Sequence, residues 1–178
     1  MLVNCRENNM ALYKLDEYYP NYSEDIFDGY DIKNFDVYAQ ADEKVGSVKN
    51  MMVDESGRLR YFIIDTGFWV FGKKVLLPVG LTRMDFDDKR VYVEQLTKQQ
   101  VEDLPEFTED LAIDRDYEER VRGVYRPSLA TPALSPVYDA ATYDYTQEPY
   151  FYEMNEPNLR MYEERLRERR NRTRADIL

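Results

Sequence analysis

A dense run of short apolar segments between residues 35 and 95 is the feature that most limits what this chain can fold into. In "RLRYFIID" (58–65), Leu59, Tyr61 and Ile63 alternate with their neighbours, which is the pattern of a β-strand. Both faces of the second half of this segment are apolar. We therefore expect that half to be buried on both sides.

Further strands are expected around this one. They are 35–40, 45–54, 73–79 and a hairpin made of 82–86 and 90–96. Pro78 marks a strand end or a sheet edge, because proline cannot donate a hydrogen bond to the ladder. Strands this short, with turns about every ten residues, predict a mainly β fold built on a small antiparallel β-barrel.

Two short helices are expected after the strands. Thr97 is a suitable N-cap for the first, which should end before the next proline. Asp116, followed three residues later by Glu119, fits a capping box at the start of the second. Gly123 and Pro127 are expected to stop that helix.

Composition divides the chain into five parts. They are an N-terminal extension of loops with one short turn of helix (1–34), the β-barrel domain (35–110), a short helix packed on or near it (111–126), a Tyr- and Pro-rich linker (127–157) and an Arg-rich helix (158–178). Because the linker has neither helical nor strand periodicity, we expect it to be flexible or extended. Its tyrosines would let it pack along a surface of its own chain or of a partner.

The Arg-rich helix has one narrow apolar face, formed by Leu159, Tyr162 and Leu166. Seven arginines and four acidic residues give residues 158–178 a local charge of +3. The helix could bind an acidic surface, a membrane lipid or RNA. Alternatively, it could dock by its apolar face on the acidic body of its own chain.

Composition also excludes several functions. A formal charge of −11 opposes nucleic acid as a partner. The chain has no histidine, so Ser-His-Asp and Cys-His catalysis and histidine-based metal sites cannot be built. Its single cysteine, Cys5, rules out an internal disulfide. No secretory leader or membrane-length apolar run is visible, so we expect a cytoplasmic protein without membrane insertion.

The aromatic residues Phe68, Trp69 and Phe71 have the strongest claim to a functional role. They lie between two glycines, and strand alternation sends them to opposite faces. A barrel interior accepts one set, so the other needs cover from a helix, the N-terminal extension or a partner. Lys73 and Lys74 follow and could grip an anionic partner, or simply begin a solvated hairpin.

Two other residue patterns favour a structural interpretation. The aspartates lie at strand ends or in turns, where Asp is ordinarily preferred over metal binding; they are Asp54, Asp65, Asp85, Asp87 and Asp88. The glycines do not form a phosphate-binding loop and are typical of bends in a small barrel; they are Gly46, Gly57, Gly67, Gly72 and Gly80. We therefore predict no catalytic residue, cofactor or metal.

Two stretches, "EKVGSVKNMMVDESGRLRYFIID" and "GKKVLLPVGL", resemble the PRC-barrel family. That family includes the cytoplasmic domain of the photosynthetic reaction centre H subunit and a barrel of a ribosome-maturation factor. The longer run from "DEYYPNYSEDIF" to "DYEERVRGVYRP" is similar to an uncharacterised bacterial group seen notably in cyanobacteria. The resemblance implies a PRC-type barrel over about residues 34–95, but the fold alone does not name a function.

We predict a non-catalytic module that recognises protein partners, including a second copy of itself. The resemblance implies two alternatives. One is an accessory factor in photosynthetic electron transport that acts on a membrane complex, like the H subunit. The other is an accessory factor for RNA or ribosome maturation.

Overall fold

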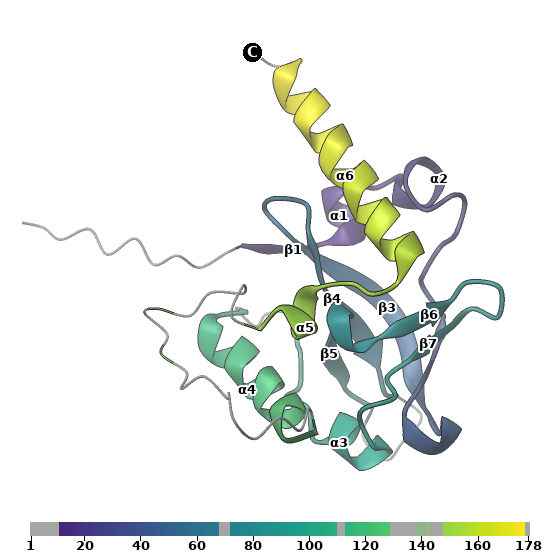
Figure 1. Cartoon of the computed structure of the whole chain (residues 1–178), viewed down its shortest axis with the longest axis vertical. Helices are drawn as coiled ribbons and strands as arrows, with labels where there is room; N and C mark the ends of the chain where they lie inside the picture. The colour runs from purple at the N-terminus through teal and green to yellow at the C-terminus, as the bar shows by residue number, and fades with distance from the viewer. Residues whose placement is uncertain are drawn as a thin grey trace, which may run out of the picture.

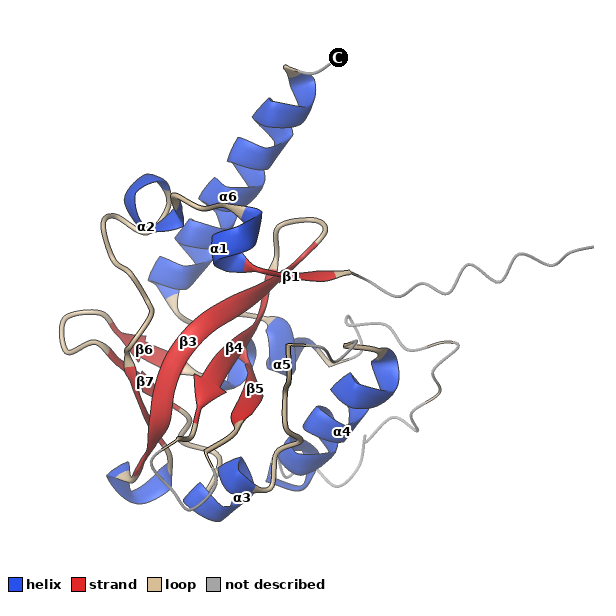
Figure 2. Ribbon diagram, turned by 180° about the vertical axis from the view of Figure 1, so that it is seen from behind, coloured by secondary structure: helices blue, strands red, loops and turns tan. Residues whose placement is uncertain are grey.

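The computed structural model describes residues 11–67, 72–109, 113–128, 139, 142 and 148–176. Its strands form one seven-stranded sheet in the order β5-β4-β3-β2-β7-β6, with β1 paired to β3 outside this path. The strands are β1 (Leu12–Lys14), β2 (Asp36–Tyr38), β3 (Lys44–Asp54), β4 (Leu59–Asp65), β5 (Lys74–Pro78), β6 (Arg83–Asp85) and β7 (Arg90–Tyr92). The fold is therefore mainly sheet, with several helices packed around it (Figures 1 and 2).

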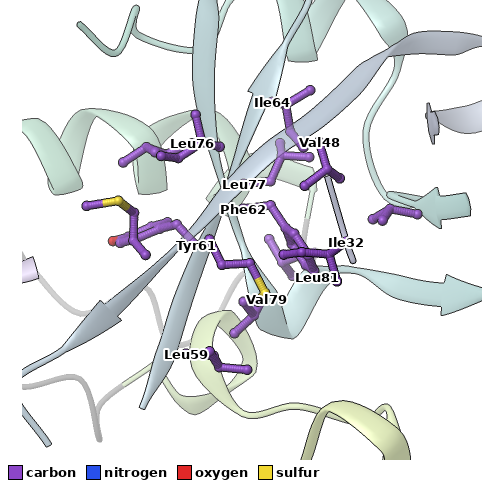
Figure 3. Packing of buried hydrophobic residues seen from close by; sticks show 14 of the residues in the cluster. Ile32, Val48, Leu59, Tyr61, Phe62, Ile64, Leu76, Leu77, Val79 and Leu81 are labelled. Carbon is purple, nitrogen blue, oxygen red and sulfur yellow. The ribbon is translucent and has the colours of Figure 1, made fainter. Parts of the chain in front are cut away.

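β3 and β4 form the central antiparallel hairpin of this sheet. Gly57 makes its turn with φ +83°, a conformation that glycine adopts without strain. The side chains of β4 are buried on both faces, as predicted. Figure 3 shows Phe62 on the side of Val48, and Tyr61 on the opposite side with Leu76.

The sheet is open between β5 and β6, so the expected closed barrel is not confirmed. Among the described residues, β5 pairs with β4 and β6 pairs with β7. β2 and β7 are parallel, although an all-antiparallel arrangement was expected. Between β5 and β6 the chain forms a 3₁₀ turn, η2 (Val79–Leu81), which redirects it out of the strand conformation.

The helices follow the predicted pattern with two corrections. α3 (Lys98–Glu102) has the expected N-cap, since the Thr97 side chain accepts from the backbone of Gln100 in a full capping box. α4 (Arg115–Tyr125) is capped by Asp114, and the capping box predicted at Asp116 is wrong.

Gly123 does not stop α4, which was the other expectation for this helix. It lies inside the helix, where its missing side chain leaves the right-handed backbone intact. A 3₁₀ turn, η3 (Arg126–Ser128), follows.

The N-terminal extension is more structured than expected. In addition to β1, it contains α1 (Leu15–Tyr18) and α2 (Tyr22–Asp25). Leu15, Ile26 and Phe27 are completely buried, so the extension completes the core.

The described end of the predicted linker also differs from expectation, because it contains α5 (Pro149–Tyr152), in which Phe151 is completely buried. α6 (Pro157–Ala175) is the predicted Arg-rich helix. Its first turns cross the body near α1 and α2, and its last turns stand clear of it (Figure 1).

Gly80 allows α5 to lie directly on η2. A Cβ placed there would lie 2.3 Å from the carbonyl oxygen of Tyr150 and 2.7 Å from the carbonyl carbon of Phe151. These are backbone atoms, which cannot move without shifting α5. Around Gly123, in contrast, a Cβ would meet nothing within 4 Å.

We expect Gly80→Ala to lower the free energy of unfolding by about 1–3 kcal/mol, because the added methyl overpacks this contact. Gly123→Ala is the matched control and should raise it by roughly 0.5–1 kcal/mol, because alanine favours the helix. Urea denaturation of both variants measures the difference. Equal effects of the two substitutions would contradict the contact.

Candidate functional site

Phe68, Trp69 and Phe71 lie outside the described residues, so their role as partner contacts stays a prediction. The structure does describe the base of their loop. The Thr66 backbone N–H donates to the Lys73 carbonyl at 2.9 Å, and the Lys73 N–H donates to the Thr66 hydroxyl at 3.2 Å. The chain therefore leaves and re-enters the sheet as a closed hairpin at this point.

Lys73 and Lys74 make contacts within the chain. The Lys73 Nζ donates to the Leu104 carbonyl at 2.7 Å. The Lys74 Nζ lies 3.3 Å from a carboxylate oxygen of Glu109, and the Lys74 carbonyl accepts from the Phe107 N–H at 2.7 Å. Both lysines thus hold the segment after α3 against the edge of β5.

The structure places Leu159, Tyr162 and Leu166 in the core, with at most 2% of each exposed. Tyr162 stacks on Phe27 with ring centroids 4.6 Å apart and meets the edge of Phe86 at 5.6 Å. The structure therefore shows one of the alternatives considered for the Arg-rich helix: its apolar face packs on the body of its own chain.

The aspartates serve the turns. Asp65 accepts from the Gly67 N–H at 2.8 Å, and Asp85 accepts from the Asp88 N–H at 3.0 Å. Asp54 is buried beside Arg60, with 2.7 Å between their charged groups. Within the described ranges, no three Cys, Asp or Glu side chains are grouped closely enough to hold a metal ion.

A pocket of about 530 Å³ opens beside Gly67, at the base of the aromatic loop. Its charged lining includes the ion pair between Lys44 and Asp36, whose atoms are 2.8 Å apart. The hydrogen bond that Lys44 donates to the Asp36 carboxylate raises the pKa of Lys44, so this amine stays protonated. A protonated amine can bind an anion but cannot act as a base or nucleophile.

A buried ionic cluster that the sequence did not reveal joins α4 to α5. Arg122 of α4 and Glu148, just before α5, are both completely buried, with 3.7 Å between their charged groups. Arg126 donates to both carboxylate oxygens of Glu148, at 2.6 and 2.8 Å, and also pairs with Glu119. We call these four residues the ionic clamp.

Two tyrosine hydroxyls connect the ionic clamp to β4. Arg122 donates to the Tyr152 hydroxyl at 2.8 Å, and this hydroxyl lies 2.8 Å from that of Tyr61. Tyr61 in turn donates to Glu118 at 2.7 Å, so the proton between the two hydroxyls comes from Tyr152. The chain of bonds runs from α4 through α5 to the sheet and back to α4.

The electrostatics of the cluster favour a structural role over a catalytic one. Burial raises the pKa of Tyr152 to about 12, so the phenol stays protonated at neutral pH. Hydrogen bonds to Glu148 raise the pKa of Arg126, which keeps the guanidinium charged and paired. The cluster thus presents neither an ionised phenol nor an unpaired carboxylate that could react. We assign it a structural role, in which it fastens α5 to the body.

One part of this cluster has a sequence signature. Glu119, Arg122 and Arg126 are spaced i, i+3 and i+7, which places them on one face of α4. Glu148 comes from the segment predicted to be a linker, and no local pattern connects it to α4. Sequence reasoning therefore missed the site.

A second feature is the exposed end of α6. Arg167, Arg170, Arg172 and Arg174 have no carboxylate within 4.0 Å among the described residues, whereas Arg165 and Arg169 pair with Asp28 and Asp25 of the body. We call the four unpaired arginines the arginine tip.

The fold and these two features define a mainly β module in which α5 is fastened to α4 and α6 ends in exposed arginines. Residues 24–100 match the family model of the PRC-barrel domain, so the expected resemblance to the PRC-barrel family is confirmed over that stretch. An uncharacterized protein of Deinococcus radiodurans is 43% identical over 88 residues, which are 47% of this chain and 31% of that protein. The match therefore spans about a third of the length of this relative. Within the described part of the chain, no helix is long and apolar enough to cross a bilayer.

Replacing Arg122 with Met should lower the free energy of unfolding by about 3–5 kcal/mol, because it leaves Glu148 buried with one charge partner fewer. Arg120→Met, on the exposed face of the same helix, should change it by less than about 0.5 kcal/mol. Chemical denaturation followed by circular dichroism compares the two. A cost for Arg122→Met no larger than that of the control would refute the clamp.

Asp54 should make the fold acid-sensitive. Burial raises its pKa, but bonds from Ser56, Arg60 and Arg58 outweigh burial and leave the pKa below the ordinary value of 3.8. Its ionised form thus contributes stability above pH 3.8 that is lost as the pH falls through the folded-state pKa. Asp54→Asn should be less stable at neutral pH by about 3–5 kcal/mol and lose less on acidification. Urea titrations at several pH values measure this, with the exposed Asp87→Asn as control; parallel pH profiles for both variants would contradict it.

Proposed function

We propose that this chain is a non-catalytic, cytoplasmic protein-interaction module, in which the PRC-barrel domain presents α6 as a rigid arm. The observation that carries the proposal is the contrast between the two halves of α6. The apolar face of its first half is buried in the body, and its second half exposes the arginine tip. The described second half has no apolar face to bury, so its charged side chains are available to a partner.

Three kinds of contact fix the direction of the arm. Leu159 and Leu166 are completely buried. The Glu163 carboxylate accepts from the Leu59 N–H at 2.9 Å, next to the β3–β4 turn. Arg165 donates to the Ile26 carbonyl at 2.9 Å. An arm anchored in this way loses little conformational entropy when a partner binds it.

The paired state of the buried charges supports a role in binding over catalysis. Enzymes use groups whose environment leaves them reactive. In the ionic clamp, the carboxylates of Glu119 and Glu148 both face arginine. The accessory roles in photosynthetic electron transport and in RNA maturation draw their support from the PRC-barrel match, and the arm geometry favours the more general role.

Affinity capture from the cells that produce the protein tests this proposal. The tip variant carries Arg172→Glu and Arg174→Glu, two exposed positions. Its control carries Lys49→Glu and Lys89→Glu, which are also exposed and change the net charge equally. We expect quantitative mass spectrometry to find a partner set that wild type and control retain and the tip variant loses by roughly tenfold or more. The same set on all three baits would count against the proposal.

A further inference from the structure

Charge is unevenly distributed along the longest axis of the molecule. The last turns of α6 lie at one end of this axis, and α3 lies at the other, in both Figure 1 and Figure 2. Residues 158–178 have a formal charge of +3 on a chain of −11, so the remaining residues carry −14. The end of the molecule farthest from the arginine tip belongs to this acidic remainder.

The arginine tip is largely accessible, and none of its arginines has a carboxylate within 4.0 Å among the described residues. Arg167, Arg172 and Arg174 are exposed, and Arg170 lies over the Tyr18 ring at 5.6 Å from its centroid. Between Arg167 and Asp176, the described part of α6 presents no large apolar side chain. The attraction of these described residues to a partner is therefore electrostatic.

The opposite end gathers acidic side chains from two elements. Asp42 and Glu43 belong to the 3₁₀ turn η1 (Gln40–Asp42) and its C-cap, and Glu102, Asp103 and Glu106 belong to α3 and the segment after it. The Gln40 N–H donates to the Leu96 carbonyl at 2.9 Å, which holds the two elements together. We call these five residues the acidic end.

Three lysines lie near the acidic end and reduce its charge. Lys44 is paired with Asp36, and the Lys73 ammonium is bonded to the Leu104 carbonyl. Lys98 is in α3 itself. Five carboxylates therefore outnumber the lysines, and Glu43 and Glu106 are exposed.

We propose that the arginine tip docks on the acidic end of a second copy of this chain, so that copies associate head to tail. This inference rests on the proposed interaction function and names the partner of the arm. The complementary charges lie at opposite ends of one molecule, and the arm reaches outward along the long axis (Figure 1). Two bodies of −14 repel one another, and docking through the arm keeps them farther apart than side-by-side packing does.

Head-to-tail docking is a heterologous contact, so each copy uses its tip on one neighbour and its acidic end on the next. Growth is then open-ended and does not stop at a dimer. The contact should also depend on salt, because exposed charges are screened over about 10 Å at 0.1 M ionic strength.

Sedimentation velocity and light scattering over a wide range of protein concentration test the contact. At low salt the weight-average mass of the wild type should rise beyond twice the monomer mass without a dimer plateau, and at high salt it should return to that of the monomer. The tip variant and an end variant with Glu43→Lys and Glu106→Lys should each stay monomeric. The Lys49→Glu, Lys89→Glu control should behave like the wild type.

Mixing the two variants gives the decisive result. The acidic tip of one variant then faces the basic end of the other, so the mixture should regain the mass that each variant lacks alone. Wild type that stays monomeric at low salt, a plateau at dimer mass, or a mixture that stays monomeric would each overturn head-to-tail docking. Salt-sensitive binding of monomeric wild type to single-stranded RNA, lost in the tip variant, would assign the tip to nucleic acid instead.

The capture experiment separates this inference from the proposed function. A monomeric protein that still loses its captured partners in the tip variant would leave the interaction module standing and remove self-docking. A protein that assembles head to tail but captures the same other proteins with and without its tip would leave a second copy of the chain as the partner of the arm.

Discussion

The burial of Glu148 against Arg122 and Arg126 is the interaction on which the C-terminal part of the structure depends. A carboxylate removed from water is costly unless cations and hydrogen-bond donors meet it. Two arginines of α4 and η3 do so here, and Tyr152 extends their bonds to Tyr61 of the sheet. Because Glu148 is fixed, α5 must lie on η2, and α6 starts only a few residues later from a fixed point.

This fastening explains how an open sheet can remain stable. β5 and β6 do not pair with each other, and the chain between them forms η2. α5 covers η2 through backbone contact at Gly80, and Phe151 fills the space behind it. The helical segment thus protects the region that a strand pair would protect in a closed barrel, and it excludes water from the Tyr61 face of β4.

Local patterns were enough to predict the strands, because alternation and turn residues act over a few positions. The central hairpin at Gly57 and the capped helix at Thr97 are such cases. In the N-terminal extension only one short helical turn was expected, whereas the structure has α1 and α2. Helices of four residues are stable only through burial of side chains such as Leu15 and Tyr22, which a local pattern does not show. The ionic clamp escaped for the same reason: the contact of Glu148 with α4 depends on tertiary packing. The sequence showed the apolar face of α6, but it did not decide whether that face packs on the chain's own body or on a partner.

The helix dipole explains only part of the charge pattern of the arginine tip. Cations near the end of a helix are stabilised by its dipole, and this effect fades beyond the last turn. It accounts for Arg172 and Arg174, close to Ala175. Arg167 and Arg170 lie earlier, and among the described residues they have no carboxylate at ion-pair distance, in a chain with 35 acidic residues. Arg170 instead lies over the Tyr18 ring, and the Arg167 side chain lies beside Gly57 of the β3–β4 turn. Neither contact supplies a carboxylate, and a partner that does so pairs all four arginines.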